Sequence, residues 1–547
     1  MKRIINTVLV LATLSATGFA LNSCQDALDI KQAGELQPEE VFTNVSNLNE
    51  ALNGSVYAQL DPIDEIYFTA VFTDEVKPGS GSGGQDYELH RFFLDPSTQA
   101  VGGGSISTVS TNGIWLNNYR VINRVNRLLE GAKNITPNTA AETTQYNSIL
   151  AQARAIRAFC YIQLETYFSP DMKDPNALGV VLIKDIPSTD AKLPRAKNQE
   201  VYDFINADLD YARGILGYST AEASRYTVGK AFVNALSARF NLYRGNTVLA
   251  KQYAQEVINN SPVLDTATGS KLTIAKPSSI LINPQDPSLG FQPIGNAAWN
   301  SAFYGTASSF NPYRNLWNDS SKGEIIFSLN RLPLGAGASI GVRWNTNQST
   351  ISGVPMWFLG RNLFNIVNST TGDIRRYNYI DPTSVIKPNY LDLPSKDDRL
   401  VIDKYPGKTS AATRNDLKVF RLSEMYFILA EAEVAAGNLT AAHDLIQQVR
   451  VARNYLGTAT TPTYTSAQFA YADILKERRV ELGLEGHRYI DLKRLATIAG
   501  VTMDRNIKDD FITLPELNLP NDSYKYTLPI PVKETSANPN IQQNPGY

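Results

Sequence analysis

The feature that most constrains the fold is a pair of helices joined by Gly-Asn, which the sequence contains twice. Around Gly245-Asn246 and Gly437-Asn438, a long segment with helical periodicity precedes the dipeptide and a second one follows it. The residues at positions +5, +8 and +12 from the glycine are Ala250, Tyr253 and Val257 in one copy and Ala442, Leu445 and Val449 in the other. A glycine at such a turn supplies the left-handed conformation that ends a helix, and a small alanine lets two helices approach closely. The repeat therefore predicts two helical hairpins.

The hairpin pattern resembles the helix pairs of tetratricopeptide repeats. Apolar residues recur at helical spacing over residues 115–260 and again over residues 419–498. Between these blocks, residues 261–418 are dense in Pro, Gly, Ser and Asn and lose the helical period, while short runs such as 324–329 are typical of strands. We therefore expect a mainly α fold, in which a tetratricopeptide-like helical-pair scaffold carries a loop-rich, partly β irregular segment.

Charge and cysteine content exclude several classes of protein. The chain has 51 Lys and Arg residues against 53 Asp and Glu, so it lacks the basic field that nucleic-acid binding needs. Two cysteines are too few for a disulfide framework. One of them, Cys160, lies in an apolar stripe at helical spacing, which indicates a buried and inert thiol.

The N-terminus has the layout of a bacterial lipoprotein signal. Lys2-Arg3 precedes an uncharged run of apolar and small residues from 4 to 21, as in a secretory signal. Residues 21–24, Leu-Asn-Ser-Cys, then match a lipobox. We expect residues 1–23 to be removed and the thiol of Cys24 to be alkylated by diacylglycerol, which tethers the mature chain to a membrane surface. An ordinary signal peptide that happens to carry a cysteine is the alternative.

The mature chain is expected to divide into two regions near residue 260. An N-terminal helical region would span residues 24–260, and a C-terminal region would span residues 261–547. The subdivisions expected within the second region are a loop-rich part at 261–418, a helical part at 419–498 and an extended, proline-containing tail at 499–547.

Three stretches of the C-terminal region resemble the SusD/RagB family of outer-membrane nutrient-binding lipoproteins. Residues 421–438 resemble the family's helix-turn pair, and residues 474–494, ILKERRVELGLEGHRYIDLKR, are closely similar to its charged signature. Residues 528–531 and 543–547 are similar to its usual ending. The opening of the mature chain also fits, so the resemblance spans nearly all of it in the expected order.

The resemblance implies a receptor without catalytic chemistry. Such a lipoprotein captures a glycan or oligosaccharide at the surface of the outer membrane and delivers it to a SusC-like TonB-dependent transporter, which it covers as a lid. Sugar rings stack on aromatic side chains, and their hydroxyls are held by amides, carboxylates and guanidinium groups. We predict no enzymatic activity, no cofactor, no metal ligand and no nucleic-acid partner.

Candidate ligand-binding residues come from the family pattern and from the loop-rich segment. The family's site typically includes a tryptophan followed three residues later by an asparagine, and Trp115 and Asn118 match this spacing. Both share a helix face with Tyr119, so a core position for Trp115 and a backbone-capping role for Asn118 are the alternative. Trp344 is the best candidate from residue chemistry, because it stands among Gly, Arg and Asn in a segment without helical period. The further candidates are Trp299, Tyr304, Tyr87 and Asp74.

The charged signature itself favours a structural role. Its charges alternate in sign at spacings suited to i, i+3 and i+4 ion pairs, which could join the last helices to the extended tail. The residues concerned are Glu477, Arg478, Arg479, Glu481, Glu485, Arg488, Asp491 and Arg494. They identify the family through its scaffold rather than through its binding site.

Two other functions remain open at this point. A surface glycoside hydrolase or peptidase is one, although the chain has only three histidines and lacks the His-Glu-x-x-His and Gly-x-Ser-x-Gly motifs. A glycosidase needs only two suitably spaced carboxylates, which the sequence does not reveal. The other is a structural lipoprotein that binds a protein partner and no small ligand.

Overall fold

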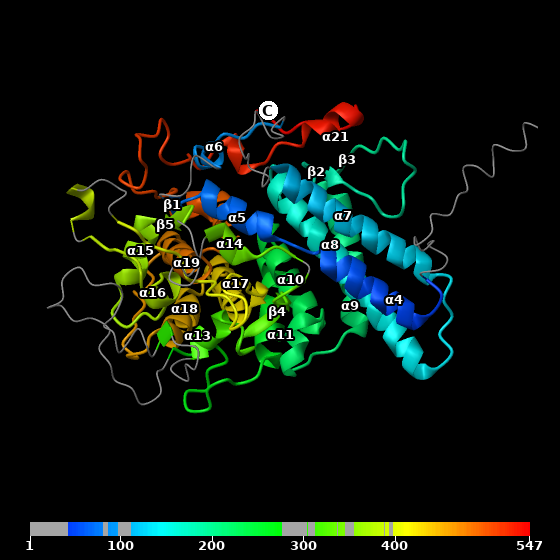
Figure 1. The fold of residues 1–547 in the computed structure, drawn as a ribbon, viewed down its shortest axis with the longest axis horizontal. Coiled ribbons are helices and arrows are strands. Elements are labelled where there is room, and N and C mark those ends of the chain that lie inside the picture. The colour runs from blue at the N-terminus through cyan, green and yellow to red at the C-terminus, as the bar shows by residue number, and fades with distance from the viewer. Residues whose placement is uncertain are drawn as a thin grey trace, which may run out of the picture.

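The computed structural model describes residues 42–79, 86–96, 111–275, 303–304, 312–335, 337–344, 355–387, 389–392 and 398–547. The predicted signal peptide and Cys24 lie outside these ranges, as does Trp299. The described part consists mainly of helices, and its sheets have two strands each (Figure 1). The predicted mainly α fold class is therefore confirmed. None of the helices in these ranges is long and apolar enough to cross a membrane.

The N-terminal region is built around one long helix, α8 (Ala140–Phe168). It packs against α4 (Val45–Ala51), α7 (Thr111–Ala132) and α9 (Asn198–Ile215) (Figure 1). Thr139 caps its N-terminus, because the Oγ1 atom accepts a hydrogen bond from a backbone N–H of the first turn at 3.1 Å. Most residues from 149 to 168 are buried on every face, as expected of a helix that is surrounded by others.

Several short elements connect α4 to α7. A π-helical turn (Leu52–Val56) and a 3-10 turn (Tyr57–Gln59) lead to α5 (Ile63–Phe72), and α6 (Tyr87–His90) follows. Every residue of α5 is buried, including two acidic ones in its first turn. Helix α5 is thus a core helix that carries two acidic side chains, which is unusual unless such groups have partners.

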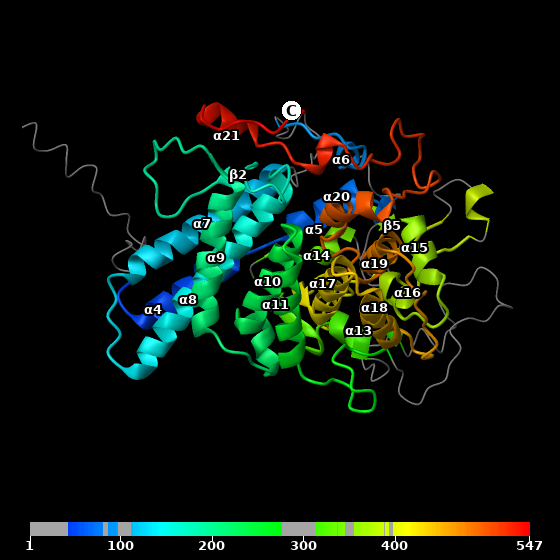
Figure 2. The same cartoon turned by 180° about the vertical axis from the view of Figure 1, so that it is seen from behind.

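The two predicted hairpins are present and lie side by side. They consist of α10 (Lys230–Tyr243) with α11 (Thr247–Asn260), and α17 (Leu422–Ala435) with α18 (Leu439–Arg453). Gly245 has φ +82° and Gly437 has φ +80°, the left-handed conformation that the turn requires. Ala250 and Ala442 are fully buried. Helix α11 also packs against α17, so the hairpins stack into one helical scaffold (Figure 2).

Two further helices and a returning tail complete the C-terminal region. Helices α19 (Ala467–Glu481) and α20 (Arg488–Ala499) pack on each other, and the tail contains only a 3-10 turn (Tyr524–Tyr526) and α21 (Val532–Ala537). The tail runs back to the N-terminal region (Figure 1). There the backbone N–H of Leu528 donates to the carbonyl of Tyr167 at 2.8 Å, and Asn544 Nδ2 donates to the carbonyl of Phe168 at 2.9 Å.

The irregular segment contributes one strand to each of two small sheets and several short helices. The antiparallel pairs of the structure are β1 (Val76–Pro78) with β5 (Trp357–Leu359), β2 (Leu178–Val181) with β3 (Arg195–Lys197), and β4 (Ile325–Leu329) with β6 (Leu417–Arg421). Strand β4 is the run that the sequence predicted. The short helices are α13 (Pro312–Trp317), α14 (Ile340–Trp344), α15 (Arg361–Asn368) and α16 (Arg375–Tyr379), and a 3-10 turn spans Tyr390–Asp392. Five to eight residues are too few to show a helical period.

The charged signature forms a buried ion-pair network. Glu481 on α19 accepts hydrogen bonds from Arg421 Nη1 and Arg453 Nη2, both at 2.8 Å, and Arg421 Nη2 also donates to Glu485 at 2.7 Å. Other pairs of the signature are Arg375–Glu477, Arg478–Asp491, Arg479–Asp504, Arg488–Asp74 and Arg494–Glu431. The interpretation as structural pairs fits this arrangement. However, most partners come from other elements rather than from the same helix face.

The second cysteine behaves as the sequence suggested. Cys160 on α8 is fully buried in the apolar core. Burial raises the pKa of its thiol well above the ordinary value, so the reactive thiolate form is suppressed. The predicted inert, packed thiol is confirmed.

Candidate functional site

Several of the predicted ligand residues gather around helix α5. Trp344 on α14 packs its ring 5.5 Å from the ring of Tyr67. Asn118 on α7 donates from Nδ2 to Glu65 Oε1 at 2.9 Å. Asp74 lies just beyond the end of α5. The structure thus brings together residues from α5, α7 and α14 that are far apart in the sequence.

Most of these candidates are nonetheless buried. Trp344 is 0% exposed and Trp115 is 1% exposed, so neither presents a ring face to solvent. Contrary to the expectation from its neighbours in sequence, Trp344 is a core residue, because α14 places its ring against Tyr67 of α5. Trp115 packs on Tyr119 and Phe168, which is the core position that its helix spacing allowed.

The two polar candidates have partners inside the protein. Asn118 is 5% exposed, and its Nδ2 also donates to the carbonyl of Ile114 at 2.8 Å, as in the backbone-capping alternative. Asp74 accepts hydrogen bonds from Arg488 Nε and Nη2 at 2.8 and 2.7 Å. Burial alone would raise the pKa of Asp74, but the guanidinium groups of Arg479 and Arg488 outweigh it and hold the pKa well below the usual range. Asp74 is therefore an internal anion that is already neutralised.

The two tyrosines are half-buried and lie in different places. Tyr87 begins α6 and donates from its hydroxyl to Asp510 Oδ1 at 3.3 Å, while one of its ring faces stacks near His90. Burial and the nearby carboxylate of Asp510 raise its pKa to about 12. Tyr304 donates to the carbonyls of Tyr377 and Ile380 at 2.8 and 2.9 Å, so it belongs to the neighbourhood of α16 rather than to that of α5.

A polar cluster that the sequence did not predict lies where these segments reach the surface. Asn117 Nδ2 donates to Asp64 Oδ2 at 3.1 Å, and Arg343 Nη2 lies 3.6 Å from Asp64 Oδ1. The guanidinium carbon of Arg343 also lies 5.1 Å from the centre of the Tyr67 ring. The side chains of Arg343 and Asp64 are 27% and 12% exposed. We refer to Asp64, Asn117 and Arg343 as the α5 cluster.

The α5 cluster rests on a rigid base. Trp357 Nε1 donates to the hydroxyl of Tyr67 at 2.9 Å, and that hydroxyl donates to Asp86 Oδ2 at 2.7 Å. Tyr67 in turn packs against Trp344. Two hydrogen bonds to the hydroxyl of Tyr67 and the packing of its ring on Trp344 thus fix this side chain beneath the polar groups.

The surroundings of Asp64 bring the pKa of its carboxyl close to neutral pH. Burial raises the pKa of Asp64 to about 6, with Arg343 opposing the shift and Asp61 adding to it. Above this pH the cluster offers an anionic acceptor, a guanidinium and a planar amide at one place. These groups can form directional hydrogen bonds with hydroxyls of a ligand.

The sequence indicated the segment that contributes Arg343 to the α5 cluster, but it favoured the adjacent Trp344 as the ligand-binding residue. The segment Gly341-Val342-Arg343-Trp344 was singled out for its tryptophan, whereas the structure buries Trp344 and leaves Arg343 partly exposed. Asp64 and Asn117 carried no signal of their own, because a single polar residue on a helix does not by itself indicate a binding site. No group of three or more His, Cys, Asp or Glu side chains suited to a metal ion occurs among the described residues.

Comparison with known proteins identifies the family. The profile of the SusD family matches residues 398–547, and a second profile, described as "Starch-binding associating with outer membrane", matches residues 93–242. The chain belongs to the SusD/RagB family. The second SusD profile covers α7 through α10, and the first covers the hairpin α17–α18, helices α19 and α20, and the tail.

Relatives and solved structures agree with this assignment over almost the whole chain. SusD-like protein P2 of Formosa agariphila is 24% identical, with 96% of this chain and 97% of the relative covered. SusD-like protein P38 of the same organism is 25% identical over 92% and 95%. A SusD superfamily protein from Bacteroides thetaiotaomicron has a TM-score of 0.68 at 21% identity, covering 92% of this chain and 100% of the other. A laminarin-binding SusD-like protein has a TM-score of 0.61 at 20% identity over 92% and 100%, which shows a shared fold.

Proposed function

We propose that this SusD-like protein is a carbohydrate-binding lipoprotein that captures oligosaccharide at the outer surface of the outer membrane. The observation that carries the proposal is the match of two SusD profiles in order along the chain, one of them described by starch binding and outer-membrane association. The similarity in fold to a laminarin-binding protein supports the same class of ligand. Binding rather than turnover is the proposed role.

The α5 cluster is the proposed place of contact with the sugar. Asp64, Asn117 and Arg343 provide the carboxylate, amide and guanidinium groups that hold sugar hydroxyls. Tyr87 and Trp299 remain proposed aromatic contacts. Trp115, Trp344, Asn118 and Asp74 would act from beneath, by holding α5, α7 and α14 in place. An exposed site of this kind is expected to bind weakly, with Kd values of roughly micromolar to millimolar.

The proposal also includes a lipid anchor at Cys24 and the delivery of captured oligosaccharide to a transporter. Acylation of Cys24 would tether the protein to the membrane, where many copies raise the effective concentration of captured ligand. Captured oligosaccharide would then pass to a SusC-like TonB-dependent transporter beneath the protein. A Cys24→Ala chain should leave the membrane fraction, and detergent extracts of the unmodified protein should retain the transporter during purification. Persistence of the Cys24→Ala chain in the membrane fraction would contradict the lipid anchor, and purification of the unmodified protein without a transporter would contradict the proposed partner.

The binding test compares substitutions in the α5 cluster with a matched arginine substitution outside it. Isothermal titration calorimetry with laminarin and starch oligosaccharides would be carried out on the chain from residue 25 and on its Arg343→Gln and Asp64→Asn variants. We expect a loss of about ten- to a hundredfold in affinity, because a hydrogen bond to a charged group contributes about 1.5–3 kcal/mol. Arg124→Gln is the control, since Arg124 lies exposed on α7 outside the cluster. Unchanged affinity in both cluster variants would show that the sugar binds elsewhere.

The same samples distinguish binding from catalysis. Oligosaccharide incubated with the protein for hours should be recovered intact, as judged by chromatography of the products. Release of shorter sugars that depends on Asp64 would instead support the glycoside hydrolase alternative. Absence of affinity for every glycan, with retention of the transporter, would favour the structural lipoprotein.

A further inference from the structure

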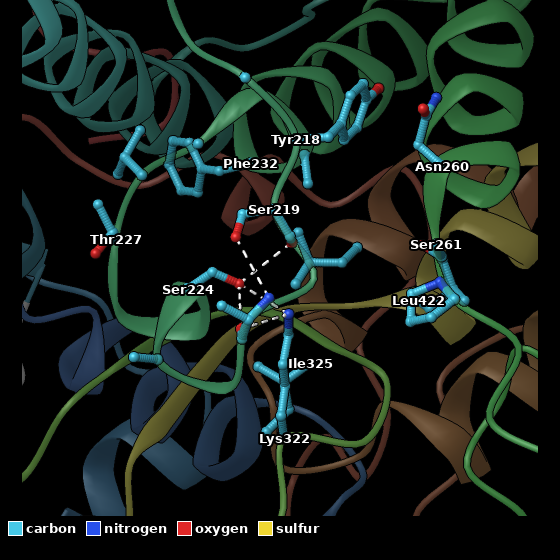
Figure 3. A pocket seen from close by; sticks show the side chains of 18 of the residues that line it. Tyr218, Ser219, Ser224, Thr227, Phe232, Asn260, Ser261, Lys322, Ile325 and Leu422 are labelled. Atoms are coloured by element: carbon cyan, nitrogen blue, oxygen red, sulfur yellow. Dashed lines mark hydrogen bonds between the residues drawn. The ribbon is translucent and has the colours of Figure 1, made fainter.

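A cleft lies apart from the α5 cluster, beside the first hairpin. It has a volume of about 420 Å³, within the range of about 300–1,000 Å³ that is typical of small-molecule sites. Its walls come from α8, the segment 216–229 before α10, the end of α11, and β4 (Figure 3). No residue of the α5 cluster lines it. A ligand in this cleft would therefore be bound independently of the proposed sugar site.

The lining divides into an apolar inner wall and a polar rim. Phe232, Ile325 and Leu422 form part of the inner wall and are each at most 3% exposed. The rim carries hydroxyls and an amide, from Ser219, Ser224, Thr227, Ser261 and Asn260 (Figure 3). A surface that offers both C–H contacts and many hydroxyl partners suits a sugar ring better than a purely apolar ligand.

An aromatic ring at the rim is held in place. Tyr218 is half-buried, and its hydroxyl accepts a hydrogen bond from Asn234 Nδ2 at 2.8 Å. In Figure 3 the ring lies near Asn260, on the side of the pocket away from Lys322. A fixed, partly exposed ring next to an amide and a hydroxyl is the combination used to stack and orient a saccharide.

Two ammonium groups give the cleft a positive charge. Lys322 Nζ donates to Ser224 Oγ at 2.8 Å and to the carbonyl of Ala221 at 3.2 Å. Lys271 Nζ donates to the carbonyls of Ile258 and Asn259 at 2.6 and 3.1 Å. An ammonium has three N–H donors, so each group has one more than these contacts use. Neither forms an ion pair with a carboxylate of the described residues.

The acidic residue of the lining does not offset this charge. Both carboxylate oxygens of Glu324 accept hydrogen bonds from Arg453 Nη2, at 2.8 and 2.9 Å, and one also accepts from Arg421 Nη1 at 2.9 Å. Glu324 is thus neutralised by two arginines behind the cleft. Burial meanwhile lowers the pKa of Lys322, with the carboxylate of Glu222 opposing the shift and Arg225 adding to it. Glu222 itself forms an ion pair with Arg225 at 2.7 Å.

We propose that the cleft is a second saccharide site, which binds a sugar bearing a carboxylate, such as a uronic acid unit. The sugar ring lies against the inner wall and Tyr218, and its hydroxyls meet the polar rim. Its carboxylate accepts the remaining donors of Lys322 and Lys271. This site is distinct from the α5 cluster, and its existence does not depend on that cluster being the place where neutral glycans bind.

The test uses two substitutions that act by different means. Lys322→Gln removes the charge but keeps a donor for the loop, and Ala223→Trp fills the mouth of the cleft from an exposed position without touching a charged group. Calorimetry with digalacturonate would be compared with maltose, a neutral disaccharide. We expect both variants to lose about tenfold or more in digalacturonate affinity. Lys173→Gln, on an exposed lysine outside the cleft, and Arg343→Gln should keep it.

The outcomes separate this proposal from the proposed function. Failure of the unmodified protein to bind digalacturonate, or binding that Ala223→Trp leaves unchanged, would overturn the second site. Equal affinity for maltose and digalacturonate, with no effect of Lys322→Gln, would overturn the preference for acidic sugars. Loss of neutral-glycan binding in Arg343→Gln would bear on the α5 cluster alone. Circular dichroism of each variant would confirm that its helical content is retained.

Discussion

The buried carboxyl group of Glu65 makes the stability of the protein depend on pH in a way that one substitution removes. Glu65 lies on α5 and is 3% exposed, and its Oε1 atom accepts a hydrogen bond from Asn118. Burial raises the pKa of this carboxyl to about 8, with the hydrogen bond from Asn118 opposing the shift and Asp64 adding to it. At neutral pH the folded protein therefore keeps a proton that the unfolded chain has lost.

The magnitude follows from the two pKa values. The unfolded carboxyl titrates near its ordinary value of 4.5 and the folded one near 8, so the folded state binds more protons throughout this window. The free energy of unfolding is highest below pH 4.5 and falls by about 1.4 kcal/mol per pH unit until pH passes 8. Between pH 5.5 and 7.5 the loss from this one group is about 2.5 kcal/mol. A glutamine keeps the acceptor for Asn118 and cannot titrate, so Glu65→Gln lacks this loss.

Urea unfolding at pH 5.5 and 7.5 provides the measurement. We expect the unfolding free energy of the unmodified protein to fall by about 2.5 kcal/mol more than that of Glu65→Gln over this interval. Glu50→Gln, on the exposed face of α4, is the control and should follow the unmodified protein. Equal pH dependence in the Glu65→Gln variant and the unmodified protein would refute the assignment of Glu65 as a neutral buried acid.

Three further substitutions test the scaffold by chemical denaturation. Arg421→Met should cost about 3–5 kcal/mol, because it leaves the carboxylates of Glu481 and Glu485 buried with one partner fewer; a loss below 1 kcal/mol would contradict the network. Gly245→Ala should cost about 1–2 kcal/mol through its φ of +82°, whereas Gly214→Ala within α9 should not destabilise. Trp344→Ala should cost about 3–5 kcal/mol, as expected of a core side chain; retained stability with lost glycan affinity would instead restore it as a direct contact.

The hairpins could be predicted from the sequence because their signals are local. A glycine that must adopt positive φ, and alanines at fixed offsets from it, lie within a dozen residues of one another. The residue at which a helix begins is harder to predict from the sequence. Thr465 and Gln468 have the spacing of a capping box, yet Ser466 is the residue whose side chain caps α19, at 3.1 Å from the N–H of Phe469.

The candidate site was harder to predict because it depends on contacts between distant segments. Trp344 occupies a five-residue helix with no visible period, and its partner Tyr67 is 277 positions earlier, so nothing nearby indicated burial. The α5 cluster draws its three side chains from α5, α7 and α14. The charged signature shows the same limit, since spacing within one helix cannot reveal partners such as Asp74.

The docking of Asn544 onto the end of α8 has a consequence for how the protein is made. Asn544 Nδ2 donates to the carbonyl of Phe168, 376 positions earlier, and Arg195 donates to Asn544 Oδ1 at 2.9 Å. Contacts of such sequence separation form slowly, because a long loop must close before they are gained. During synthesis, the C-terminal end of α8 therefore stays incomplete until Asn544 has emerged. A segment that is made early in synthesis thus reaches its final packing only after residue 544 has been made.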